Sequence, residues 1–363
     1  MILLSVIVPF HNSASKCSRL LDTIIACKDN EIEVILVDDG STDGTSELLS
    51  SAISKAEIHI SLHQQVNKGP GGARNTGLAA ARGEYIWFVD SDDNMDLHAA
   101  AIELRSHSEQ KFDFIDFKID TGDSVHRSIG FDAGYFVVSS ENDYGHRLFD
   151  CFGRLWSKIF SRRLFDKYEI TYPEFCIYED NPVGLVLPLV TKNFLVSDRC
   201  VYFHYEDAPS VTRGIRSDRH FDRLYTSFLG WGIASRICEG CDQFQDSLRK
   251  KLIKLALFNT SPQKRSGPGA WFQKARICAY FRRECQRRNL EYRQDMMTNA
   301  ENMSPKRRLL FVSIWLVSMF LPDQSGYFDK KRLKAWGRRF ESDDFVDVEK
   351  ARLAFCSRNL NDS

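Results

Sequence analysis

The chain has 363 residues, and its 49 lysines and arginines balance its 49 aspartates and glutamates. This balance excludes the strongly basic field of nucleic-acid-binding proteins, so we expect no nucleic-acid partner. The length leaves room for a full-sized core domain and a second, smaller unit.

The N-terminal run at residues 2–8 resembles a signal peptide only superficially. It has no basic residue before it and no small-residue cleavage site after it, and Pro9 and His11 interrupt it. We therefore expect a strand here and a cytoplasmic protein. The ten cysteines form no secreted framework, and the CxxC pair of Cys238 and Cys241 has no second pair to complete a zinc site, so a structural role is favoured.

The first quarter of the chain alternates between strand and helix patterns. Short apolar runs predict buried strands at residues 3–8, 33–37, 58–63 and 85–89. Apolar residues at helical spacing follow Ser13 and Ser41, and a helix of small residues at 73–81 follows a flexible glycine turn at 69–72. This alternation predicts a doubly wound α/β sheet.

The remainder of the chain divides into a mixed part and a helical part. Residues 96–205 combine helix patterns at 97–104 and 180–186 with strand-like runs at 112–119, 131–138, 156–160 and 201–205. After residue 217 helical spacing dominates. We predict an α/β domain over 1–215, with halves at 1–95 and 96–215, followed by a mostly helical C-terminal region over 216–363.

The apolar segment 309–321 follows the basic cluster Pro305-Lys306-Arg307-Arg308. It is shorter than the roughly 20 residues that a membrane-spanning helix needs. Residues 306–321 fit either a peripheral contact with an anionic membrane or a buried helix of the C-terminal region, and burial is favoured.

An acidic turn follows the strand at 85–89, where Asp90, Asp92 and Asp93 lie within four residues. Ligands bind just past the carboxyl ends of such strands. Three crowded carboxylates need a cation or a network of donors to offset their repulsion. A hard divalent ion, Mg²⁺ or Mn²⁺, usually arrives with phosphate. A solvated acidic turn is the alternative.

Three polar features are expected at one end of the sheet: Asp38 with Asp39, Arg74 with Asn75, and the acidic turn. A nucleotide needs an acceptor for a base N–H, donors for phosphate oxygens, a carboxylate for ribose hydroxyls and a cation for the diphosphate. The set supplies each of these groups.

Four motifs in order carry a resemblance to the family 2 glycosyltransferases with the GT-A fold, over about residues 2–213. They are SVIVPFHN at 5–12, VDDGSTDGT at 37–45, GGARNTG at 71–77 and FVDSDD at 88–93. His11 stands where the family more often has tyrosine. The resemblance implies a GT-A, Rossmann-like domain that binds a nucleotide sugar.

The resemblance also implies roles for the donor side of the site. The backbone at Pro9 and the side chain of Asp39 would hold the base, with Asp38 nearby. Arg74 and Asn75 would border the nucleotide pocket. Asp90 would face the ribose, and Asp92 would bind the divalent metal ion. The alternatives are a salt bridge for Arg74 and a helix cap for Asn75.

On the acceptor side, the resemblance makes Asp180 the catalytic base and Glu179 an orienting residue. Favourable charge at a helix N-terminus is the alternative for this pair. His204 is a candidate metal ligand or a packed strand residue, and Arg213 a phosphate clamp or a loop arginine. Two further residues fall where relatives shape the acceptor pocket, namely Trp156, for which a core position is favoured, and Lys158.

The resemblance, together with these residues, implies an inverting, metal-dependent hexosyl- or N-acetylhexosaminyltransferase in bacterial capsule or lipopolysaccharide synthesis. It would use a nucleoside diphosphate sugar, with UDP expected, and a glycan or lipid-linked acceptor at the inner face of the cytoplasmic membrane. Two other classes remain. A nucleotidyltransferase would need a glycine-rich phosphate loop with a lysine, which is missing near the first strand, and a non-catalytic binding protein would keep the fold alone.

Overall fold

The computed structural model describes residues 1–205, 220–260, 268–294, 304–322 and 345–359, together with residues 298, 301 and 324. Contacts divide the chain into two compact units. The first consists of Met1–Arg213 and Asp344–Ser363, and the second of Gly214–Asp343.

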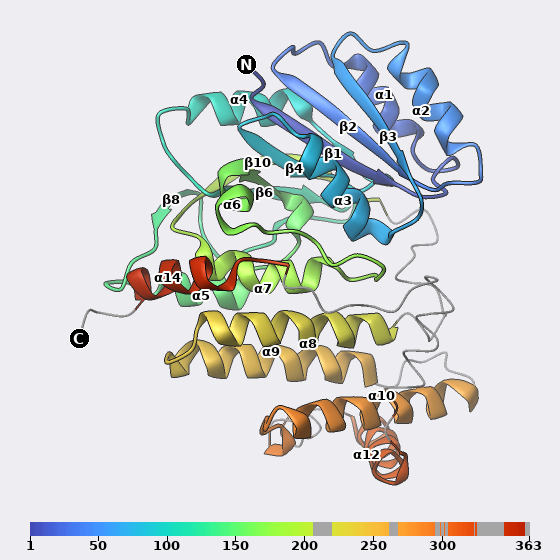
Figure 1. Ribbon diagram of the computed structural model, residues 1–363, viewed down its shortest axis with the longest axis vertical. Helices are drawn as coiled ribbons and strands as arrows, with labels where there is room; N and C mark the ends of the chain where they lie inside the picture. Colours follow the sequence, from blue (N-terminus) through green and yellow to red (C-terminus); the bar gives the residue numbers. More distant parts are fainter. Residues whose placement is uncertain are drawn as a thin grey trace. The chain divides into compact units, whose positions relative to one another are not determined.

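The first unit is built around a ten-stranded sheet (Figure 1). Its order is β3-β2-β1-β4-β9-β6-β10-β5, with β7 paired to β6 and β8 to β10. The strands are β1 (Leu4–Phe10), β2 (Ile32–Asp39), β3 (His59–Gln65), β4 (Tyr85–Phe88), β5 (Asn94–Met95), β6 (Phe114–Asp120), β7 (Val125–Arg127), β8 (Gly134–Val137), β9 (Lys158–Ser161) and β10 (Asn193–Phe203).

Strands β1 to β4 are parallel, as the sequence predicts, and β9 is antiparallel to both β4 and β6. The register pairs Phe10 of β1 with Asp38 of β2, and β4 ends beside Ile7 of β1. The residues that follow these strands therefore meet at one edge of the sheet, which is where ligands bind in open α/β folds.

Helices cover both faces of this sheet (Figure 1). The helices of the first unit are α1 (Ser18–Ala26), α2 (Thr45–Ile53), α3 (Gly69–Ala80), α4 (Leu97–Ser106), α5 (Tyr144–Cys151), α6 (Arg162–Tyr168), α7 (Asp180–Val190) and α14 (Val348–Asn359), with a 3₁₀ turn at Leu155–Ser157.

Alternation along β1 decides which helix lies on which face. Val6 and Val8 share a buried cluster with Leu20 of α1. Ile7 points to the opposite face, where Gly77 of α3 approaches so closely that an added Cβ would lie 2.3 Å from Ile7 Cγ2. The small residues of α3 thus let this helix lie directly on the sheet.

The glycine stretch 69–72, predicted as a flexible turn, is the first turn of α3. Gly69 has a φ of +84°, which favours glycine, and Pro70 fits the first helical turn because its missing N–H is not needed there. At Gly71 an added Cβ would lie 2.0 Å from the carbonyl oxygen of Pro173. The glycines serve close packing rather than flexibility.

Helix α14 belongs to the first unit, whereas the sequence placed residues 345–359 in the C-terminal region. It packs on α6 and α7, and the chain before it is held by two backbone hydrogen bonds. The amide of Asp347 donates to Tyr168 O and that of Thr171 to Phe345 O, both at 2.8 Å. The domain boundary predicted near residue 215 lies outside the described residues.

The second unit is helical in its described part, which confirms the predicted helical region. Its helices are α8 (His220–Ile237), α9 (Asp242–Thr260), α10 (Pro268–Arg287) and α12 (Pro305–Phe320). Helix α12 buries Phe311 and Ile314 but exposes Leu309 and Phe320. None of the described helices has the length and apolar composition needed to cross a membrane.

Candidate active site

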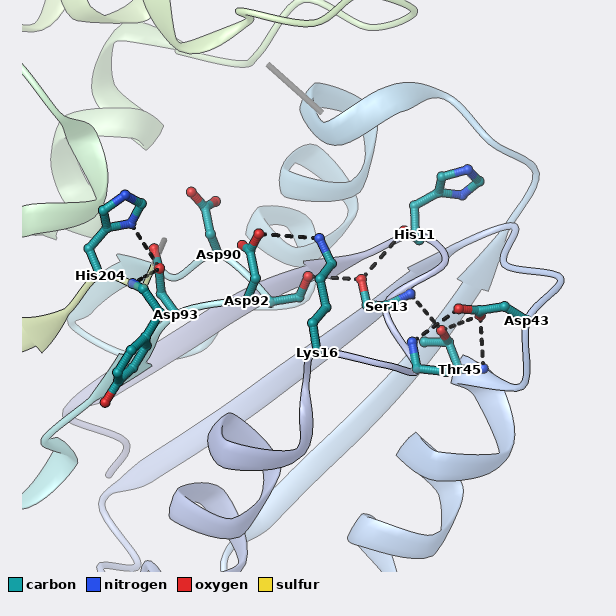
Figure 2. A network of polar contacts seen from close by, with 12 residues as sticks. His11, Ser13, Lys16, Asp43, Thr45, Asp90, Asp92, Asp93 and His204 are labelled. Carbon is teal, nitrogen blue, oxygen red and sulfur yellow. Dashed lines mark hydrogen bonds and ion pairs between the residues drawn. The ribbon is translucent and has the colours of Figure 1, made fainter. Parts of the chain in front are cut away.

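The acidic turn after β4 carries three carboxylates, Asp90, Asp92 and Asp93 (Figure 2), and the structure gives each its own partner. Asp90 pairs with Arg74 at 2.8 Å and Asp92 with Lys16 at 3.2 Å. Asp93 lies 2.9 Å from the ring of His204. The repulsion expected in this turn is therefore offset by three separate side chains.

Asp93 anchors the turn to the end of β10. Its carboxylate is buried and accepts hydrogen bonds from Tyr202 Oη at 2.6 Å and from the amide of Tyr205 at 3.1 Å. The sequence showed Asp93 as part of the acidic run but gave it no separate role. Because β10 lies over a hundred residues later in the chain, only the fold brings these partners together.

Arg74 joins the acidic turn to the start of α7. Its buried guanidinium donates from Nη2 to Asp90 Oδ1 at 2.8 Å and from Nη1 to Glu179 Oε1. Burial lowers the pKa of Arg74, but the charges of Glu179 and Asp90 outweigh it and hold the pKa above its ordinary value. The salt bridge, offered as an alternative role for Arg74, is present and lies within the site.

Glu179 is buried beside this cation. Burial raises the pKa of Glu179 to about 7, with Arg74 opposing the rise and Asp180 adding to it. Burial likewise raises the pKa of Asp90 against the opposing charge of Arg74. Carboxyls whose pKa values lie well above the ordinary range are typical of functional sites.

Asp180 is the first residue of α7 and is half-buried. Its carboxylate makes no hydrogen bond or ion pair with any residue that the structure describes. Tyr178, two positions earlier, has a φ of +64°, a strained value for a bulky residue. The start of α7 therefore carries two adjacent carboxylates. Glu179 is paired with Arg74, and Asp180 is not paired with any residue that the structure describes.

Asp38 and Asp39 organise the loops at the same sheet edge. Asp39 accepts from Gln65 Nε2 at 2.7 Å and from the amides of Lys68 and Gly69, both at 2.8 Å. Burial raises the pKa of Asp39 despite these hydrogen bonds. Asp38 accepts from the amide of Ser41 at 3.0 Å. Both carboxylates thus fix loop geometry beside Pro9, and their predicted base contacts stay predictions.

Two predicted site residues make structural contacts. Lys158, predicted to contact the acceptor, is fully buried and pairs with Asp116 at 2.9 Å, so its ammonium is out of reach of an acceptor. Burial lowers its pKa, against the opposing charge of Asp116. The amide of Asn75 bonds the Tyr172 backbone twice, at 2.8 and 2.7 Å, and so holds α3 against the chain before α7.

Trp156 and His204 form a ring stack beside the acidic turn, with centroids 5.4 Å apart. Trp156 is half-buried and also stacks on Tyr202 at 4.4 Å, so it joins the core to the site. His204 Nδ1 faces Asp93 rather than Asp92. Arg213, the predicted phosphate clamp, lies outside the described residues.

No group of three or more His, Cys, Asp or Glu side chains among the described residues is arranged to hold a metal ion. Magnesium-type sites, however, often use one or two carboxylates together with substrate phosphates. Asp92, whose side chain is 30% exposed, fits that pattern. A shared site of Asp92 and His204 stays a prediction.

Residues 5–168 match the family model described as glycosyl transferase family 2. The chain contains a family 2 glycosyltransferase domain. The chain is 40% identical over 90 residues to an uncharacterized glycosyltransferase of Nostoc sp., and these residues are 25% of this chain and 28% of that protein. The uncharacterized glycosyltransferase EpsJ of Bacillus subtilis is 27% identical over 241 residues, which are 63% of this chain and 69% of EpsJ.

Solved structures place the family 2 domain in the GT-A fold. TarS 1–349 of S. aureus matches with a TM-score of 0.60 at 20% identity, over 94% of this chain and 93% of TarS 1–349. Its complex with UDP-GlcNAc matches with a TM-score of 0.52 at 18% identity, over 98% and 90%. A mannosyltransferase of Pyrobaculum calidifontis in complex with GDP-Man and Mn²⁺ matches at 0.50 and 16%, over 92% and 85%.

The family match ends before α7, so Glu179, Asp180 and His204 lie beyond it. Arg74 within the family 2 domain contacts Glu179, the neighbour of Asp180. Asp93 within the domain contacts His204. Sequence reasoning missed Lys16, because no pattern in Ser15-Lys16-Cys17 distinguishes it from a solvated lysine.

Proposed function

We propose that this chain transfers a hexosyl or N-acetylhexosaminyl group, with inversion, from a nucleoside diphosphate sugar to a hydroxyl of a glycan acceptor. The observation that carries the proposal is the position of Arg74. It pairs at once with Asp90 of the acidic turn and with Glu179, the neighbour of Asp180. A donor-side carboxylate and an acceptor-side carboxylate are thereby held around one buried cation.

On the donor side, the loops fixed by Asp38 and Asp39 beside Pro9 would receive the base, and Asp90 would face the ribose. UDP is the expected nucleotide, supported by the TarS complex with UDP-GlcNAc. Asp92 would hold Mn²⁺ or Mg²⁺, and that ion, when bound, would stabilise the negative charge of the departing diphosphate.

On the acceptor side, Asp180 would take the proton from the attacking hydroxyl. Transfer with inversion is one in-line displacement in which the acceptor oxygen bonds to the anomeric carbon as the bond to the diphosphate oxygen breaks. Asp180 suits the role of base because no residue that the structure describes forms a hydrogen bond or ion pair with its carboxylate. Glu179 and Arg74 would hold the start of α7 in place, and Trp156 would form a wall of the acceptor pocket.

Calorimetry and thermal unfolding with a panel of UDP- and GDP-sugars test this proposal, each with and without Mn²⁺. A ligand bound only by the folded protein raises its melting temperature, so even weak binding is detectable. We expect one donor to bind in a Mn²⁺-assisted manner and Asp92→Ala to lose the assistance. Failure of every nucleotide sugar to bind would contradict the proposal.

We further propose that the enzyme acts in cell-surface glycan synthesis at the cytoplasmic side of the membrane, on a glycan or lipid-linked acceptor. Helix α12 supports peripheral contact, because Leu309 and Phe320 are 74% and 87% exposed on a helix whose first turn contains Lys306. Sedimentation with anionic vesicles should exceed that with neutral vesicles, and Phe320→Ser should weaken it. Equal sedimentation with both vesicle types would oppose this role.

A further inference from the structure

Lys16 places a positive charge directly against the acidic turn. It lies between β1 and α1, and its Nζ is 3.2 Å from Asp92 Oδ2 (Figure 2). The side chains of Lys16 and Asp92 are 20% and 30% exposed, so the pair lies at the surface of the site, where a ligand can reach both groups. A lysine in this position bears directly on whatever cation Asp92 binds.

Hydrogen bonds fix the loop that carries Lys16. Ser13 Oγ lies 2.9 Å from Ser91 Oγ in the acidic turn. The Ser13 amide donates to Thr45 Oγ1 at 2.8 Å (Figure 2). Ser13 and Ser91 are both buried, and the amide of Lys16 itself donates to Ser13 O at 3.1 Å. The loop and the turn are thus joined by hydrogen bonds, and the backbone of Lys16 is held beside Asp92.

The neighbouring carboxylates do not share this lysine. Asp90 pairs with Arg74, and Asp93 is surrounded by the partners described above. Among the described residues, Lys16 is the cation that forms an ion pair with Asp92. A divalent ion on Asp92 would compete for the carboxylate that Lys16 contacts, and like charges only a few ångströms apart repel.

We propose that Lys16 is a built-in counter-ion of Asp92 that competes with the divalent ion and passes to the donor diphosphate when the donor binds. The inference rests on the proposed function. Without a donor, Lys16 neutralises Asp92 and keeps the affinity for metal low. With a donor, phosphate oxygens offer the ammonium a new partner, because lysine binds phosphate as a mobile point charge. Lys16 thereby couples metal binding to donor binding.

Titration with Mn²⁺ alone, followed by electron paramagnetic resonance, tests the competition without any nucleotide. Lys16→Met removes the charge and keeps an unbranched side chain that is one atom shorter, and we expect it to tighten Mn²⁺ binding about tenfold. Lys16→Arg should bind Mn²⁺ as the wild type does. Lys28→Met is the matched control, because it removes an exposed lysine paired with Glu57 at 3.0 Å on the surface.

UDP binding measured by calorimetry tests the second half of the proposal. In EDTA, Lys16→Met should bind UDP about tenfold more weakly than the wild type. The factor by which UDP raises Mn²⁺ affinity should also be smaller in Lys16→Met. Thermal unfolding confirms that each variant is folded.

The proposal is overturned if Lys16→Met binds Mn²⁺ with wild-type affinity, or if neither protein binds Mn²⁺ at all. It is also overturned if UDP affinity in EDTA is unchanged. If no nucleotide binds the wild type but Lys16→Met still tightens Mn²⁺ binding, the proposed function fails while the competition between Lys16 and metal stands.

Discussion

Arg74 is the residue whose removal should affect the site most. Its side chain is 10% exposed and that of its partner Glu179 is 6% exposed. Arg74→Met keeps an apolar stem of similar length but leaves Glu179 and Asp90 without their cation. Breaking a buried ion pair by removing one partner costs about 3 to 5 kcal/mol. At pH 8 we expect the free energy of unfolding to fall by about 3 kcal/mol.

This loss should depend on pH, because the remaining carboxyls can take up protons. The pKa of Glu179 is already raised to about 7 by burial while Arg74 opposes the rise, so removing Arg74 raises it further. When the pKa of a carboxyl is higher in the folded than in the unfolded protein, the protein loses stability as the pH rises from the unfolded pKa to the folded pKa. At pH 5, with Glu179 protonated, the cost should fall to about 1 kcal/mol.

Urea unfolding at pH 5 and pH 8 measures both values. Arg74→Met combined with Glu179→Gln should recover most of the loss at pH 8, because no buried carboxylate is then left unpaired at Glu179. Arg105→Met is the matched control: Arg105 also pairs with two carboxylates, Asp29 and Glu31, but is 38% exposed, so the cost should stay below about 1 kcal/mol. An equal loss at both pH values, unrelieved in the double variant, would refute the reasoning.

Three further predictions concern stability. Gly77→Ala should lower the free energy of unfolding in urea by about 1 to 3 kcal/mol, because its Cβ would meet Ile7. Gly184→Ala in α7 has no atom within 4 Å of the added Cβ, so it should raise the free energy of unfolding by about 0.5 to 1 kcal/mol. Equal effects of the two substitutions would contradict the packing of α3. Asp93→Ala should lower stability by about 2 kcal/mol or more, because it removes the acceptor for Tyr202 Oη and the Tyr205 amide; an unchanged melting temperature would show that this anchor is unimportant. Relative to Glu179→Gln, the wild type should lose stability as pH rises from about 4.5 to about 7, since the pKa of Glu179 is raised in the folded protein; a parallel pH dependence of the two melting temperatures would contradict this.

The strands and the sheet edge could be predicted from the sequence because both depend on local signals. Buried runs such as 33–37 and 85–89 end in Asp38 and in the acidic turn, and parallel pairing brings those ends together. The glycines at 69–72 were misread because their use depends on what approaches them. Only the fold shows that the chain at Pro173 lies against Gly71.

The partners of the site residues could not be predicted, because they come from distant parts of the chain. Arg74 and Glu179 are 105 residues apart, and Lys16 and Asp92 are 76 apart. The burial of Lys158, which the resemblance assigned to the acceptor pocket, could not be predicted for a related reason. Nothing local reveals that Asp116 neutralises it inside the sheet.

The most direct test of the central claim is sugar transfer by Asp180→Asn, measured alongside nucleotide binding. Glu174→Gln is the control, because Glu174 precedes α7 and lies in a surface ion pair with Lys68 at 3.6 Å. We predict that Asp180→Asn binds the donor nucleotide with wild-type affinity but loses at least a hundredfold in transfer rate, as expected for a missing general base, while Glu174→Gln keeps both. Wild-type transfer by Asp180→Asn would contradict the account.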